Sequence, residues 1–131
     1  MPKFGSRSKK RMKGLDSRLI DILDELIKIM DVTIIEGLRS AETQNKYYLD
    51  KKSKLDGYKK KSKHQTGRAV DLAPYPVNWK DTKRFYYMGG MIRGIAKERN
   101  IKIRWGGDWD SDGETKDQTF MDLVHIEVLN T

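Results

Sequence analysis

The chain has 131 residues, of which 37% are hydrophobic and 35% charged, so it can form one domain with a core and a heavily charged surface. It contains no cysteine, which excludes disulfides and thiolate metal sites, and no apolar run approaches the roughly 20 residues that a membrane helix needs. A net charge of +8 favours a polyanionic partner, such as a nucleic acid, an anionic membrane face or an anionic cell wall, without choosing among them.

Capping residues and apolar spacing divide the chain into helices and strands that do not alternate regularly. In chain order we expect helices over residues 6–14 and 16–30, a strand over 32–36, a helix over 40–52, a loop over 53–66, a strand over 68–73, a helix over 81–99, and strands over 101–105 and 123–128. Residues 51–63 hold seven lysines and one acid, and we interpret them as a solvated loop, with a mobile flap or a wall-binding patch as alternatives. This order predicts an α+β domain with a small antiparallel sheet and flanking helices.

The first histidine, His64, is followed by Asp71 on the strand expected over residues 68–73. Strand alternation places Asp71 on the face opposite Val70 and Leu72. A buried carboxylate without a partner is costly, so Asp71 needs either a neighbouring Arg or Lys or a metal ion.

The second histidine, His125, lies on the last expected strand. The β-branched residues of that strand would face the core, so His125 and Glu127 would point from the other face, as Asp71 does. Two histidines and one aspartate form a set of three ligands that leaves a fourth position for water, as in catalytic zinc sites. The alternative is two unrelated histidines in hydrogen-bonded loop or core positions.

Four further residues could complete a hydrolytic site around such a metal. Asp122 would lie at the entry of the last strand as a general base, with Glu127 as a second candidate or as a hydrogen-bond partner of a ligand histidine. Arg39 follows the first strand, where it could clamp an oxyanion or a substrate carboxylate, and Gln44 on the next helix could support it. Each also has an ordinary interpretation as a turn residue or a solvated side chain.

Four segments spread over nearly the whole chain form one ordered pattern. They are the basic opening 4–15, Glu36-Gly-Leu-Arg39-Ser with Gln44, Ser62-x-His64-x-x-Gly67-x-Ala69-x-Asp71, and Trp105-Gly-Gly-Asp-Trp with Asp122-x-x-His125. The pattern resembles phage endolysins of the L-alanyl-D-glutamate peptidase type. These are similar to a wider group of zinc peptidases that includes D-Ala-D-Ala carboxypeptidases, vancomycin-resistance dipeptidases and the hedgehog N-terminal domain.

The resemblance implies a role for each matching residue. Zinc would be held by a set of three ligands: His64, Asp71 and His125. Asp122 would be the general base and Arg39 would stabilise the oxyanion, while Ser62, Gln44 and Glu127 would have supporting roles. Many relatives outside the endolysins carry Glu at the position of Asp122, which keeps Glu127 open as the base.

The resemblance also implies a fold and a function. The fold would be hedgehog-like or D-Ala-D-Ala-peptidase-like, with residues 1–131 forming a single catalytic domain and no separate wall-binding domain. The function would be hydrolysis of the L-Ala–D-Glu bond of the peptidoglycan stem peptide, with a D-Ala-D-Ala-type carboxypeptidase or a non-catalytic zinc-binding recognition module as alternatives. A monomer that binds the stem peptide and the anionic cell envelope is expected, held in the host cytoplasm until its release to the wall or periplasm because no signal peptide is evident. A nucleic-acid partner is not expected, since no DNA- or RNA-binding signature accompanies the basic clusters.

An acidic segment near the end of the chain allows a second metal hypothesis. Asp108, Asp110, Asp112 and Gly113 match the first half of an EF-hand loop, but the residues at the ninth and twelfth positions are a lysine and a threonine. A solvated acidic loop and a degenerate calcium site both remain open.

Overall fold

The computed structural model describes residues 2–108 and 122–129. Its elements, in chain order, are α1 (Ser6–Arg11), α2 (Ser17–Leu26), β1 (Val32–Glu36), α3 (Ala41–Leu49), the 3₁₀ helix η1 (Lys63–Thr66), β2 (Ala69–Pro74), α4 (Thr82–Glu98), β3 (Ile103–Gly106) and β4 (Asp122–Val128). Every expected helix and strand is confirmed to within a few residues. The expectation of a loop throughout 53–66 was wrong, because its last four residues form η1. Among the described residues, no helix is long and apolar enough to span a membrane.

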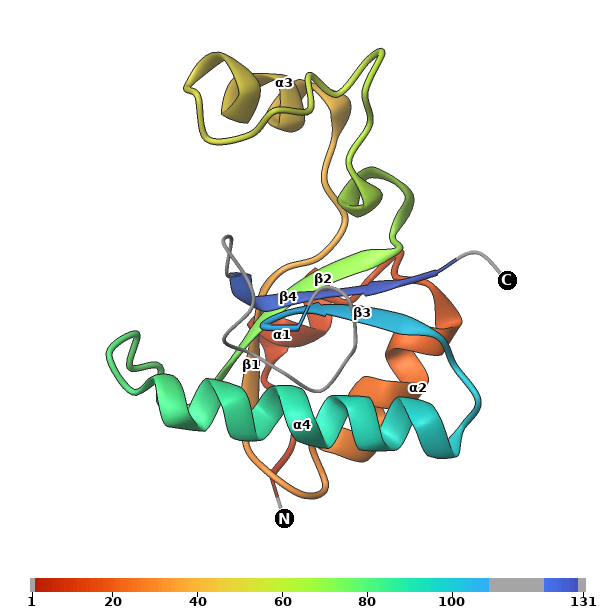
Figure 1. Cartoon of the computed structure of the whole chain (residues 1–131), viewed down its shortest axis with the longest axis vertical. Coiled ribbons are helices and arrows are strands. Elements are labelled where there is room, and N and C mark those ends of the chain that lie inside the picture. The colour runs from red at the N-terminus through yellow and green to blue at the C-terminus, as the bar shows by residue number, and fades with distance from the viewer. Residues whose placement is uncertain (1, 109–121, 130–131) are drawn as a thin grey trace.

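The four strands form one antiparallel sheet in the order β1-β2-β4-β3, which confirms the expected fold class. Helices α2 and α4 pack together and against the sheet, and Figure 1 shows α4 running along one side of it. The apolar residues of β2 and β4 that face these helices, such as Val70, Leu72 and Ile126, are fully buried. The opposite face of the sheet is therefore available for polar chemistry.

Helix α2 is held to the core by its apolar face, whereas α3 has no such face. Asp16 caps α2 by accepting a hydrogen bond from the Arg18 backbone amide at 2.9 Å, and the helix buries four apolar residues. Ser40 caps α3 in the same way, but the residue that α3 buries is the polar Gln44. Figure 1 accordingly shows α3 and the chain that follows it standing away from the sheet.

Close packing between α4 and β3 depends on a glycine in the helix. A Cβ at Gly89 would overlap the Trp105 indole, which also donates a hydrogen bond from Nε1 to the Leu123 carbonyl at 3.0 Å. Its neighbour Gly90 faces open space. Trp105 therefore holds β3 and β4 against α4, and β4 is the strand that carries His125.

Candidate metal centre and catalytic cleft

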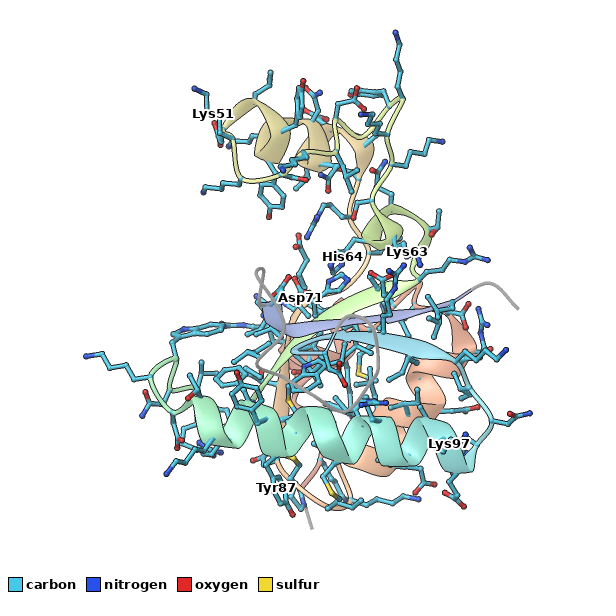
Figure 2. The ribbon with its side chains drawn as sticks, in the orientation of Figure 1. Lys51, Lys63, His64, Asp71, Tyr87 and Lys97 are labelled. Carbon is cyan, nitrogen blue, oxygen red and sulfur yellow. The ribbon has the colours of Figure 1, made fainter. Side chains whose placement is uncertain are left out.

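Strand pairing brings two predicted site residues face to face. Asp71 on β2 lies directly opposite His125 on β4, and Asp71 Oδ1 is 3.1 Å from His125 Nδ1. From the first turn of η1, His64 places its Nε2 3.3 Å from the same oxygen. Figure 2 shows His64 above Asp71 on the side of the sheet away from α4. One ligand atom from each of the three residues lies within 4.8 Å of the others.

The short helix η1 orients His64. Ser62 caps η1 by accepting a hydrogen bond from the His64 backbone amide at 3.2 Å. Gly67 ends η1 with a φ of 74°, which favours glycine, and a Cβ there would overlap the Gly14 carbonyl oxygen. The His64 ring donates from Nδ1 to the Gly37 carbonyl at 2.9 Å. Because that carbonyl can only accept, this bond fixes the ring with Nε2 turned toward Asp71.

Glu127 orients the second histidine in the same manner. Its Oε1 lies 2.9 Å from His125 Nε2, which leaves Nδ1 facing Asp71. Its Oε2 is 2.7 Å from Lys63 Nζ and 3.5 Å from Arg104 Nη2. Burial would raise the pKa of Glu127, but the hydrogen bonds with His125 and Lys63 lower it to about 2. Glu127 is therefore an ionised carboxylate that is held in place next to His125.

The three side chains fit a divalent cation with nitrogen and oxygen ligands. Two ligands that bind zinc at about 2.0–2.1 Å in a tetrahedron lie about 3.3–3.4 Å apart, close to the distances from Asp71 to the two histidines. Burial would raise the pKa of Asp71, but the hydrogen bonds with His125 and His64 hold it well below its usual range. Burial would likewise lower the pKa of His125, yet the hydrogen bonds with Asp71 and Glu127 raise it to about 9. The site therefore favours positive charge.

Asp122 begins β4 and lines the same cleft. Burial raises the pKa of its carboxyl, and the charge of nearby Asp71 raises it further. Its partner in β3 is Gly106, where a Cβ would overlap the Asp122 carbonyl oxygen. A glycine at that position thus allows the close strand approach that positions a carboxylate with enhanced proton affinity.

Arg39 lies in the wall of the cleft and is held on three sides. Its Nη1 donates to Gln44 Oε1 at 2.6 Å, its Nη2 pairs with Glu36 Oε1, and its guanidinium carbon lies 4.7 Å from the centre of the Tyr47 ring. Its Nε is buried without a hydrogen-bond partner among the described residues. Glu36 and Tyr47 were not predicted as site residues, although Glu36 opens the motif that contains Arg39.

The cleft has a volume of about 970 Å³ and joins the metal-ligand candidates to the chain between α3 and η1. All residues proposed for the zinc site and its chemistry line it or contact its lining. One feature of this cleft was not predicted: five lysines of the segment interpreted as a solvated loop lie along it, at positions 51, 52, 54, 61 and 63.

The calcium hypothesis receives no support. Asp108 is 1% exposed, and its Oδ2 accepts a hydrogen bond from Arg93 Nη1 at 2.8 Å, so this carboxylate already has a cationic partner. The other two proposed ligands, Asp110 and Asp112, lie outside the described residues.

Comparisons with known proteins agree with this geometry. Residues 1–129 match the model of the phage L-alanyl-D-glutamate peptidase family. The L-alanyl-D-glutamate peptidase of Escherichia phage T5 is 31% identical over 135 residues, covering 97% of this chain and 98% of the phage protein.

Two solved structures share the fold. The Serratia marcescens L-Ala D-Glu endopeptidase ChiX superimposes with a TM-score of 0.78 at 23% identity, covering 97% of this chain and 90% of ChiX. The vancomycin-resistance D,D-pentapeptidase VanY, a Zn(II) complex of its E175A mutant, gives 0.55 at 14% identity, covering 88% of this chain and 73% of VanY. The resemblance noted from the motifs is confirmed: the chain is a peptidase that belongs to the phage L-alanyl-D-glutamate peptidase family.

Proposed function

We propose that the protein is a zinc-dependent endopeptidase that hydrolyses the L-Ala–D-Glu bond of peptidoglycan stem peptides. The observation that carries this proposal is the His64, Asp71 and His125 cluster at the floor of a large cleft, beside Asp122. The name of the T5 relative supports the bond, and the Zn(II) in VanY supports the metal. We further propose that residues 1–131 act as one monomeric catalytic domain that reaches the wall after release from the host cytoplasm.

When bound, zinc would supply a Lewis acid that polarises the scissile carbonyl and lowers the pKa of a water molecule. Asp122, whose pKa is raised by burial, accepts a proton from the attacking water and returns it to the departing amine. Arg39 offers positive charge to the carbonyl oxygen as negative charge develops there. Glu36 and Gln44 keep its guanidinium in place.

Glu127 is a poorer choice as the base. Both of its oxygens are engaged, one with His125 and the other with Lys63, and its pKa lies at about 2. A carboxylate with so low a pKa has little affinity for a proton at neutral pH. We therefore assign Glu127 to the orientation of His125 and proton transfer to Asp122.

Mass spectrometry of digested peptidoglycan tests the proposal. The zinc-loaded protein should release fragments with new L-Ala carboxyl and D-Glu amino termini, and a chelator should abolish them until zinc is restored. Asp122→Asn should lose cleavage, whereas Asp21→Asn, the same change on the exposed side of α2, should not. A zinc-dependent cut at D-Ala–D-Ala would contradict the proposed bond, and cleavage that persists in chelator would contradict the proposed metal.

A further inference from the structure

One wall of the cleft carries a cluster of positive charge with no described counter-ion. The lysine wall consists of Lys51, Lys52, Lys54 and Lys61, all of which line the cleft and are exposed. Lys63, by contrast, pairs with Glu127. Within residues 2–108 and 122–129, none of the four lysines of the wall forms an ion pair. We call α3 and the chain between α3 and η1 the lobe. Figure 2 shows Lys51 on this lobe and Lys63 close to His64.

The acids of the cleft do not neutralise this wall. Glu36 is paired with Arg39 and Glu127 with Lys63. The other two, Asp71 and Asp122, lie at the metal-ligand candidates. A divalent cation would offset the charges of the last two. An excess of lysine charge along one side of a cleft attracts an anionic group on the bound molecule.

Hydrogen bonds fix the segment that carries the lysines. Gln44 donates from Nε2 to Ser53 Oγ at 2.9 Å and to the Leu55 carbonyl at 2.8 Å. Asn45 donates to the Asp56 carbonyl at 2.9 Å. The Asp56 carboxylate accepts from the backbone amides of residues 58–60, so it serves the turn of the chain. The lysine wall is therefore held in place along the cleft.

We infer that the lysine wall binds the free α-carboxylate of the D-Glu residue on the departing side of the scissile bond. This inference rests on the proposed function. In the stem peptide D-Glu is joined to the next residue through its γ-carboxyl, so its α-carboxylate is ionised and lies next to the L-Ala–D-Glu bond. A lysine ammonium is a compact cation that suits such a carboxylate.

Two synthetic peptides that differ in one group test the inference. One is N-acetyl-L-Ala-γ-D-Glu-L-Lys, and the other carries an α-carboxamide in place of the D-Glu α-carboxylate. The zinc-loaded wild-type protein should cleave the acid with a kcat/KM about tenfold higher than the amide, mainly through KM, since exposed charge pairs are individually weak. High salt should reduce this preference because it screens exposed charges.

The matched variants decide whether the lysine wall is responsible. The triple variant Lys52→Gln, Lys54→Gln, Lys61→Gln should cleave the acid as slowly as the amide and leave the rate for the amide unchanged. Lys51 is left unaltered because its φ of 61° makes its backbone sensitive to substitution. The control variant Lys59→Gln, Lys60→Gln removes charge from the same segment outside the cleft lining and should keep the preference.

Retention of the acid preference in the triple variant, or an equal loss for both peptides, would overturn the inference while leaving the proposed function intact. If the wild-type protein cleaves neither peptide, the proposed function is wrong. Calorimetric binding of the same two peptides to the zinc-loaded protein then decides the inference separately. Equal affinities for acid and amide would overturn it, and an acid preference that the triple variant loses would support it.

Discussion

Gln44 links the guanidinium of Arg39 to the segment that carries the lysine wall. It is fully buried, and it accepts one hydrogen bond from Arg39 and donates two, to Ser53 Oγ and the Leu55 carbonyl. Gln44→Leu removes all three bonds at similar volume. Gln44→Glu keeps an acceptor for Arg39 and removes the donor that holds the segment.

The free-energy cost of Gln44→Leu follows from the three hydrogen bonds that it removes. Two neutral bonds contribute about 1 kcal/mol each and the bond from the charged guanidinium about 1.5–3 kcal/mol, so Gln44→Leu should cost about 3.5–5 kcal/mol. Because α3 has no apolar face and stands away from the sheet in Figure 1, this cost should appear in opening of the lobe and not in global unfolding. A loss of 3.5 kcal/mol increases the open population roughly 300-fold.

Hydrogen exchange followed by mass spectrometry measures this opening directly. In Gln44→Leu, peptides within residues 41–56 should exchange roughly 300-fold faster, while peptides from α4 should keep the wild-type rate. Asn45→Ala is the matched control, because it removes one neutral bond, to the Asp56 carbonyl, and should accelerate exchange only about fivefold. Peptide cleavage should fall further in Gln44→Leu than in Gln44→Glu, which still holds Arg39.

Either of two results would refute this reasoning. Exchange in Gln44→Leu within about threefold of wild type would mean that the three bonds contribute little net free energy. Equal acceleration in the lobe and in α4 would mean that the lobe and the core unfold as one cooperative unit.

Three further perturbations test other parts of the site. Gly106→Ala forces β4 away from β3 at Asp122, so kcat should fall with a lower Tm, and wild-type kinetics would contradict the assigned position of the base. The side-chain hydrogen bond from Arg18 lowers the pKa of Asp16 from 3.8 to about 2, so its stabilisation is present above about pH 4 and is lost as the pH falls through about 2. Urea unfolding should therefore find Asp16→Asn destabilised at pH 7 but close to wild type near pH 2, and a constant difference would count against this account. Glu127→Gln should weaken zinc affinity about 10- to 100-fold in competition with a chelating dye, and unchanged affinity would argue against its orienting role.

Local patterns in the sequence were sufficient to predict the α-helices, the strands and the strand faces. A capping residue precedes α2 at Asp16 and α3 at Ser40, and alternation in the strands assigns Asp71 and His125 to the face away from the core. Alternation cannot predict which residues lie opposite each other across two strands that are some fifty residues apart. The direct pairing of Asp71 with His125 depends on the register that the shared core imposes.

The features that were not predicted depend on interactions with a weaker signal in the sequence. The helix η1 was missed although Ser62 and Gln65 form a capping box, a recognisable start signal, because the element is only four residues long and its neighbours are polar. The ion pair of Glu36 with Arg39 joins the end of β1 to the chain before α3, and the lysine wall is positioned by hydrogen bonds of Gln44 on α3, which has no apolar face. Hydrophobic periodicity predicts structure in segments that are stabilised by burial of apolar surface. It does not predict structure in segments that are stabilised by polar side-chain hydrogen bonds.

The two parts of the cleft are thus stabilised by different forces. Asp71 and His125 lie on central strands whose other face is packed against α2 and α4, so a change in their geometry would disturb the hydrophobic core. The lysine wall depends on hydrogen bonds centred on Gln44. Substitutions in the lobe can therefore alter how substrate is held without altering the metal-ligand candidates. Zinc affinity should stay at the wild-type value in Gln44→Leu even where peptide cleavage is lost. Asp71 and His125 lie on the sheet, and His64 is held by Ser62 and the Gly37 carbonyl, neither of which bonds to Gln44.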